Sequence, residues 1–237
     1  YDSMPSLVGS EMCIRDRILG EQIELTVAGR TDAGVHAMGQ VVSFCSSSPR
    51  LDCERLRVAL NGMCSADIRI QAVTPVADDF NARFSATERM YHYYILNSPL
   101  ADPLRGDIEW HIPEPLNVDA MSRAARLFLG EHDFTSFCLQ QDSRPDGSSP
   151  TMVRRVTATS WRRVPDGPSG ADLLEFEVSA SAFCQRMVRS MVGTLVAVGR
   201  GEMAVDAMPA VLAARKRQAA ADSAPPQGLV LWSVSYS

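Results

Sequence analysis

Alternation of apolar and polar positions predicts several β-strands along this chain, because side chains of a strand point to opposite faces with a period of two. The segments that alternate in this way are 23–27, 42–44, 68–73, 91–95, 152–163, 173–180 and 229–236. Apolar residues spaced three and four apart predict helices instead. These helical segments are 51–61, 118–129, 184–198 and 206–217, and Gly199 is expected to end the third of them.

The order of these elements predicts the fold class. Two successive strand-rich halves each carry inserted helices, rather than a regular alternation of strand and helix. This order favours an α+β fold with antiparallel or mixed sheet and flanking helices over a doubly wound parallel sheet.

Composition limits the kinds of protein that this chain can be. The chain has 237 residues, of which 46% are apolar, and this is enough for a substantial core. The six cysteines lie far apart, with no C-x-x-C pair and no histidine at metal-ligand spacing, so we expect reduced thiols and neither a metal site nor a disulfide framework. No apolar run is long enough to cross a membrane, and the cytoplasm is the expected location.

Charge gives two opposing indications about nucleic acid. A net charge of −5 argues mildly against it, whereas Lys216 is the only lysine and arginine supplies every other basic side chain. The arginine guanidinium suits bidentate phosphate contacts and stacking on bases, although a genome rich in arginine codons gives the same composition. Basic residues outnumber acidic ones within 180–217, which points to a cationic surface there.

A glycine-rich turn between the first two predicted strands carries the strongest candidate for chemistry. The segment GRTDAGVHA, residues 29–37, places the Asp32 carboxylate beside the Arg30 guanidinium, and its glycines allow close backbone approach. Taken alone, Asp32 is better explained as a turn or helix-capping residue than as a catalytic one.

Several motifs in a fixed order resemble the TruA family of tRNA pseudouridine synthases. They are GRTDAGVHA with GQVVSF (29–44), DFNARFSAT with RMYHY (79–93), EHDFTSF (131–137), AFCQRMVR with VG (182–193), and AP with GL (224–229). The resemblance implies the pseudouridine synthase fold with a catalytic cleft between its halves. It also implies an isomerase that converts uridine to pseudouridine in the anticodon stem-loop of tRNA, acting as a homodimer without a cofactor or a metal.

The resemblance also implies roles for individual residues. Asp32 matches the carboxylate that attacks the target uridine as nucleophile or base, and Arg189 matches its basic partner. Tyr91 matches the tyrosine that stacks on the flipped base. Arg30 and Arg83 are expected to contact phosphate or position the base. The alternatives are a solvated helix arginine for Arg189, core packing for Tyr91, and a surface role for the two other arginines.

The beginning of the chain departs from the family pattern. By motif comparison the resemblance starts at about residue 18, so residues 1–17 are expected to be foreign to the fold, with the two halves at 18–110 and 111–237. This departure keeps open a catalytically impaired RNA-binding protein of the same fold. A hydrolase acting on a glycosidic bond is a further alternative, but such enzymes usually pair two carboxylates, and the motifs offer no second one beside Asp32.

Overall fold

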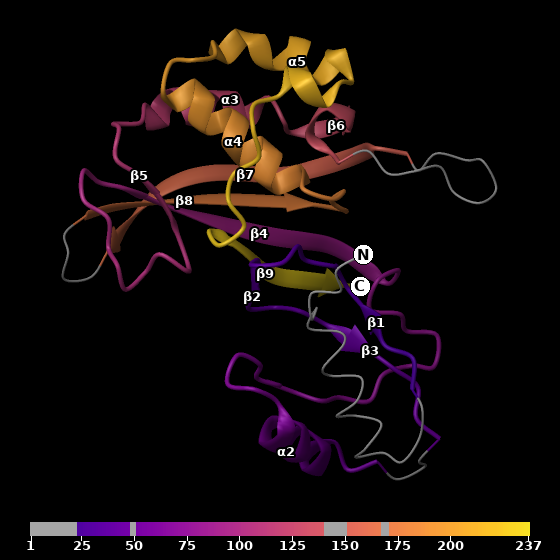
Figure 1. Cartoon of the computed structure of the whole chain (residues 1–237). Coiled ribbons are helices and arrows are strands. Elements are labelled where there is room, and N and C mark those ends of the chain that lie inside the picture. Colours follow the sequence, from indigo (N-terminus) through magenta and orange to yellow (C-terminus); the bar gives the residue numbers. More distant parts are fainter. Residues whose placement is uncertain (1–22, 48–50, 140–150, 167–170) are drawn as a thin grey trace. The chain divides into compact units, whose positions relative to one another are not determined.

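The computed structural model describes residues 23–47, 51–139, 151–166 and 171–237, which form two compact units (Figure 1). Of the described residues, the small unit comprises those of 23–33 and 41–86, and the large unit comprises those of 34–40 and 87–237. The expected halves at 18–110 and 111–237 stay a prediction, and by their contacts residues 87–110 group with the large unit. The segment 1–17 lies outside the described residues.

The small unit contains a short antiparallel pair of strands and one helix. Strand β1 (Thr26–Val27) pairs with β3 (Val42–Ser43), and helix α2 spans Cys53–Met63. The carboxylate of Asp52 accepts a hydrogen bond from the Arg55 amide at 3.0 Å, so this aspartate caps the N-terminus of α2. The helix predicted over 51–61 is therefore confirmed.

The strand predicted over 68–73 is wrong. Ile70 donates its amide to Asn61 Oδ1 at 2.8 Å and accepts from Asn61 Nδ2 at 2.9 Å. A side-chain amide thus satisfies both backbone groups that a neighbouring strand would otherwise satisfy. The apolar alternation here reflects an irregular segment held against α2.

A seven-stranded sheet forms the large unit, in the order β2-β9-β4-β8-β7-β6, with β5 beside β4. The strands are β2 (His36–Ala37), β4 (Ala86–Asn97), β5 (Trp110–Ile112), β6 (Gly130–Asp133), β7 (Val153–Asp166), β8 (Ala171–Ala180) and β9 (Leu229–Tyr236). Strands β4, β8, β7 and β6 pair antiparallel in succession, whereas β2 is parallel to β9 and β5 to β4. The sheet is mixed, and the α+β prediction is confirmed.

Helices cover one side of this sheet (Figure 1). They are α3 (Val118–Arg126), α4 (Met187–Gly199) and α5 (Met208–Ala214), with the short 3₁₀ turns η1 (Thr135–Phe137), η3 (Val205–Ala207) and η4 (Arg217–Ala219). The single helix predicted over 206–217 is instead the succession η3, α5 and η4.

The predicted C-cap at Gly199 is also wrong, since Gly199 is the last helical residue and Arg200 is the cap. A Cβ at Gly199 would lie 2.6 Å from Met121 Sδ, so this position has glycine because α3 and α4 pack closely there. The backbone enters the left-handed region two residues later, at Gly201 with φ +76°.

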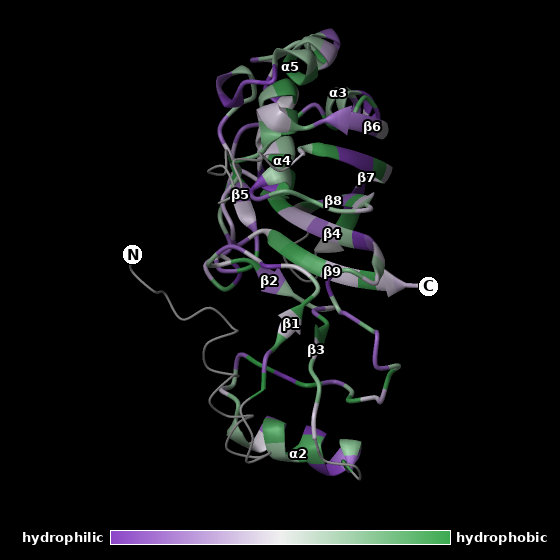
Figure 2. Cartoon of the chain, turned by 90° about the vertical axis from the view of Figure 1, so that its right-hand side faces the viewer, coloured by the Kyte–Doolittle hydropathy of each residue, from purple (hydrophilic) through white to green (hydrophobic). Residues whose placement is uncertain are grey.

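Strand β4, strand β8 and helix α4 supply the centre of the core. Tyr93 and Ile95 of β4, Phe176 of β8, and Met191 and Leu195 of α4 are fully buried. Figure 2 shows hydrophobic positions along α4, where it lies beside the sheet. In the part of the chain that the structure describes, no helix is long and apolar enough to cross a membrane.

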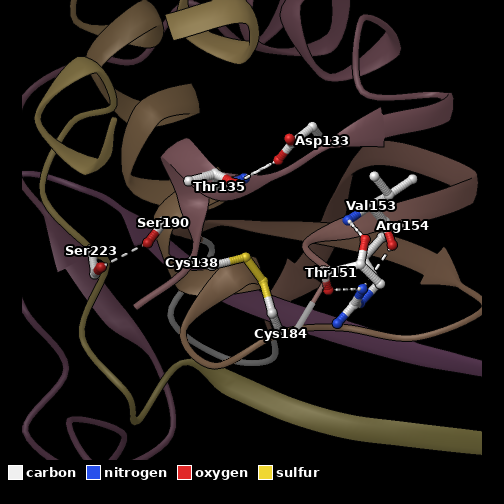
Figure 3. Close-up of a disulfide and its surroundings, with 9 residues drawn as sticks. All are labelled: Asp133, Thr135, Cys138, Thr151, Val153, Arg154, Cys184, Ser190 and Ser223. Atoms are coloured by element: carbon white, nitrogen blue, oxygen red, sulfur yellow. Dashed lines mark hydrogen bonds between the residues drawn. A yellow bond between two sulfur atoms is a disulfide. The ribbon is translucent and has the colours of Figure 1, made fainter. Parts of the chain in front are cut away.

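Cys138 and Cys184 form a disulfide, so the expectation that the cysteines are reduced is wrong for this pair (Figure 3). Their Cα atoms are 5.8 Å apart although 46 positions separate them in sequence. Cys138 follows η1 and Cys184 precedes α4, and the Leu139 amide donates to the Gln185 carbonyl at 3.0 Å. The fold brings these segments together, and cysteine spacing carries no sign of it.

Candidate catalytic and RNA-binding residues

Asp32 lies immediately before a tight turn at Ala33 and Gly34. No helix starts at this point, because β2 follows the turn, and the helix-capping alternative for Asp32 is therefore excluded. Gly34 has φ +79°, and a Cβ there would lie 3.1 Å from Pro226 Cγ. The positive φ favours glycine two residues after the candidate carboxylate, and the close approach of Pro226 leaves little room for a side chain there.

The segment that follows the turn is anchored to β9. His36 and Ala37 pair in parallel with Val230 and Leu231 of that strand. The Met38 and Gly39 amides both donate to the Leu231 carbonyl, at 2.9 and 3.2 Å. This anchoring fixes the chain only a few residues beyond Asp32.

The ring of His36 donates from Nε2 to the carbonyl of Asp107 at 2.8 Å. It therefore ties β2 to the segment between β4 and β5. This contact supports a structural role for His36 rather than that of a general base.

Tyr91 and Tyr93 point to the same face of β4 but have different surroundings. The Tyr93 ring is fully buried, and its hydroxyl donates to the Pro225 carbonyl at 2.7 Å. Burial raises the pKa of this phenol far above its usual value, opposed by the Arg189 guanidinium, so Tyr93 stays protonated and keeps its donor. Tyr91 retains 8% exposure and meets Phe183 edge-on at 5.1 Å between ring centroids.

Arg189 is held by the segment around Ala224. Its Nε donates to the Ala224 carbonyl at 2.7 Å, and its own carbonyl accepts from the Ala224 amide at 2.9 Å. A Cβ at Gly193 would lie only 1.8 Å from the Asp222 carbonyl oxygen, so glycine is required for this backbone to reach α4. A freely solvated role for Arg189 is excluded by these contacts.

Most of the basic residues predicted to form a cationic surface over 180–217 have structural partners. Arg200 pairs with Glu114 at 3.3 Å, and Arg215 pairs with Asp133 at 3.0 Å. Arg217 donates to the Ala220 and Ala221 carbonyls and to Ser223. Several of these basic side chains therefore form ion pairs and hydrogen bonds that hold the segment after α4 in place.

Arg30 and Arg83 lie in the small unit, and both are exposed. The Arg83 guanidinium stands 5.4 Å from the ring centroid of Phe84. The structure thus brings Tyr91 and Arg189 into the large unit, and Asp32, Arg30 and Arg83 into the small one. The pairing of Asp32 with Arg189 stays a prediction.

A buried ionic cluster occupies the other face of β4 and β8. His92 Nδ1 lies 3.4 Å from Glu175 and Nε2 lies 3.6 Å from Glu177, and these are the three residues in the described chain that could jointly hold a metal ion. Arg162 already donates to Glu175 from Nε at 2.6 Å. Because this guanidinium supplies the positive charge that a metal would bring, we interpret the cluster as an ion-pair network.

Comparison with known proteins agrees with these motifs. The profile of the tRNA pseudouridine synthase family matches residues 7–85 and 124–237. A tRNA pseudouridine synthase A from Moorella thermoacetica is 42% identical over 234 residues, covering 98% of this chain and 89% of that protein. Its counterpart from Rhodopseudomonas palustris strain HaA2 is 39% identical over 235 residues, covering 99% of this chain and 91% of the relative. The chain belongs to the tRNA pseudouridine synthase family.

The extent of the match corrects one expectation. Similarity to the pseudouridine synthases begins at residue 7 in the family profile, earlier than the residue 18 inferred from motifs. The profile covers Asp32, Arg83 and Arg189, whereas Tyr91 falls between its two matched ranges. The assignment of Tyr91 therefore rests on the motif RMYHY and on its contrast with the fully buried Tyr93.

Proposed function

We propose that this chain isomerises uridines in the anticodon stem-loop of tRNA to pseudouridine, with Asp32 as its catalytic carboxylate. The reaction class follows from membership of the pseudouridine synthase family. The anticodon arm as substrate region and the role of Asp32 are supported by the motif GRTDAGVHA. The single observation that carries the assignment is the Asp32 turn, which is built on a glycine with positive φ and fastened to β9 directly afterwards.

The chemistry requires one carboxylate and a means of holding the detached base. Asp32 attacks the target uridine as nucleophile or base, the bond from N1 to the ribose breaks, and uracil turns. A bond then forms from C5 to the ribose, and any covalent bond that Asp32 formed as a nucleophile breaks, which restores the carboxylate. C5 loses its proton and N1 gains one, so the atoms balance. Tyr91 stacks on the flipped uracil, which lets the base rotate while the aromatic ring still covers one face.

Arg189 is proposed as the basic partner of Asp32, which is the role that the motif AFCQRMVR implies for it. Support comes from the hydrogen bond that Arg189 Nε donates to the Ala224 carbonyl, which restricts the conformations open to this side chain. Arg30 and Arg83, both exposed, are proposed to contact the RNA backbone or position the base.

Two finer properties complete the proposal. A homodimer that grips tRNA with both subunits, located in the cytoplasm, is what the family resemblance implies for this chain. The test is sedimentation of the protein alone and with tRNA, and a monomer in both samples would contradict the dimer.

The decisive experiment replaces Asp32 by Asn. We expect Asp32→Asn to abolish pseudouridine formation while tRNA affinity stays within a few fold, because affinity comes from many phosphate contacts and chemistry from one carboxylate. Asp67→Asn is the matched control, since Asp67 is an exposed aspartate in the same unit. Pseudouridine is mapped by chemical modification and primer extension.

The same assay separates the alternatives. Turnover of Asp32→Asn close to that of the unchanged protein would overturn the assignment. Binding of tRNA without conversion by the unchanged protein would favour the impaired RNA-binding protein, and release of free uracil would favour the hydrolase.

A further inference from the structure

Phe84 is the most exposed phenylalanine, tyrosine or tryptophan in the described part of the chain, with 78% of its surface accessible. It lies in a turn of the small unit just before β4. Single exposed apolar side chains are common on protein surfaces, so exposure alone assigns no role. The surroundings of the ring carry the inference.

The turn that displays Phe84 is rigid. Asn81 Oδ1 accepts from the amides of Arg83 and Phe84, both at 3.0 Å. Asn81 and Ser85 close the turn with two further bonds, from the Asn81 amide to Ser85 Oγ at 3.0 Å and from the Ser85 amide to the Asn81 carbonyl at 2.8 Å. The ring is therefore presented from a fixed backbone and is not exposed merely because a loop is loose.

The same turn is fastened to the strand pair of the small unit. Ala82 is fully buried, and its amide donates to Ser43 Oγ on β3 at 3.0 Å. Side chains on either side of the turn thus differ sharply, with Ala82 packed inward and Phe84 directed to solvent. Such a turn positions one aromatic ring at a defined place on the surface.

A cation accompanies the ring. The Arg83 guanidinium stands 5.4 Å from the Phe84 ring centroid, within the range of a cation–π contact. A flat apolar ring beside a positive charge matches the two parts of a nucleotide, its base and its phosphate. The pair is suited to an unpaired nucleotide, whose base face is free to stack.

We propose that Phe84 is a stacking residue for an unpaired base of the RNA substrate other than the target uridine, with Arg83 contacting the adjoining phosphate. This inference rests on the proposed function, because it assumes an RNA substrate. It assigns the target uridine to Tyr91 and a different unpaired base to Phe84. A base that has no pairing partner keeps both faces for stacking, and an aromatic ring can cover one of them.

The experiment compares Phe84→Leu with Phe84→Tyr. Leucine keeps apolar bulk but has no aromatic face, whereas tyrosine keeps the face. The probes are an unmodified tRNA transcript and an anticodon stem-loop RNA in which 2-aminopurine replaces an unpaired loop base. We expect Phe84→Leu to weaken RNA binding about tenfold, the scale of one base stacked on an aromatic ring, and Phe84→Tyr to stay within about twofold.

The fluorescence of the probe reports stacking directly. Binding should quench 2-aminopurine with the unchanged protein and with Phe84→Tyr, but much less with Phe84→Leu. Val76→Ala is the matched control, since Val76 is a 55% exposed apolar side chain of the same unit, and it should change neither affinity nor quenching. Arg83→Gln should lower the dependence of log affinity on log salt by about one unit, whereas Phe84→Leu should leave this slope unchanged.

Each contrary outcome has a definite meaning. Unchanged affinity and quenching in Phe84→Leu overturn the stacking role, as does a Phe84→Tyr variant no better than Phe84→Leu. A change of oligomeric state in Phe84→Leu, with the RNA contacts intact, would assign the ring to a contact between copies and also overturn it. Fluorescence needs no turnover, so absence of pseudouridine in the unchanged protein would defeat the proposed function without deciding the stacking result.

Discussion

Two tyrosines, two positions apart on one strand, illustrate how the fold separates structural from functional roles. The Tyr93 hydroxyl donates a hydrogen bond to the Pro225 carbonyl, and the ring is fully buried, so no face of it is open to a nucleotide. Tyr91 meets Phe183 edge-on and retains some exposure. The two side chains therefore predict different consequences of substitution.

We expect Tyr91→Ala to weaken capture of the flipped uridine by about 1–3 kcal/mol, the usual value of stacking a base on an aromatic ring, and Tyr91→Phe to retain most of it. Tyr93→Phe should instead lower the free energy of unfolding by about 1 kcal/mol, because the Pro225 carbonyl loses its hydrogen-bond donor. Steady-state kinetics and urea unfolding of both variants distinguish the two effects. If Tyr93→Ala reduced kcat/KM more than Tyr91→Ala at equal folded fraction, the assigned register would be wrong.

The sequence was sufficient to nominate Asp32, Arg189 and Tyr91 as candidates, because motif order is a local property, and their roles stay predictions. It could not show that Arg189 is held by Ala224, since their contact joins residues 35 positions apart. The sequence also could not show that Phe84 is exposed, because a turn has no regular period that indicates which side chain faces solvent. Burial and long-range hydrogen bonds depend on tertiary structure, which periodicity does not encode.

At the scale of elements, α4 packs closely against the segment that precedes β9. The Asp222 carbonyl approaches Gly193 so closely that a Cβ there would lie 1.8 Å away. The sequence does not indicate which segment packs against α4 at this position. It also misassigned Gly199, whose small size serves packing against Met121.

Gly193→Ala should therefore destabilise the protein by about 1–3 kcal/mol through overpacking, although alanine is the better helix former. The displaced segment would also disturb the hydrogen bonds between Arg189 and Ala224, so kcat should fall in the fraction that remains folded. Gly62→Ala in α2 is the matched control, because a Cβ there meets nothing within 4 Å and should be neutral or stabilising by up to about 1 kcal/mol. Equal effects of the two substitutions in thermal unfolding and turnover would contradict this account.

At the scale of the whole molecule, the disulfide joins η1 to the start of α4 across 46 positions (Figure 3). Cross-linking of this length restricts the unfolded chain, so reduction should lower the free energy of unfolding by about 2–4 kcal/mol. Urea unfolding with and without a dithiol reductant measures the effect. The double variant Cys138→Ala/Cys184→Ala should not respond to reductant, whereas Cys45→Ser, which alters an exposed free cysteine, should respond like the unchanged protein.

The ion-pair network on the other face of the sheet makes global stability depend on pH. His92 is almost fully buried and stacks on Trp232 at 4.3 Å between centroids, while Nε2 has no hydrogen-bond partner. Burial lowers the pKa of His92 below its ordinary value of 6.5, and the carboxylates of Glu175 and Glu177 only partly oppose this, with Arg162 adding to it. The folded protein therefore holds this imidazole neutral at a pH where the unfolded chain has begun to protonate it.

The sign of the pH effect follows from this difference. Below about pH 6.5 the unfolded state binds a proton that the folded state does not, so the free energy of unfolding falls as pH decreases, until the folded-state pKa is reached. One such group contributes at most about 1.4 kcal/mol per pH unit.

His92→Gln removes this titration. The free energies of unfolding of the variant and the unchanged protein are compared in urea from pH 7.5 to about pH 5. Their difference should shift in favour of the variant as pH falls. His92→Phe keeps an aromatic ring against Trp232 and should show the same shift, which separates loss of titration from loss of stacking. A difference independent of pH in both variants would show that His92 protonates alike in the folded and unfolded states.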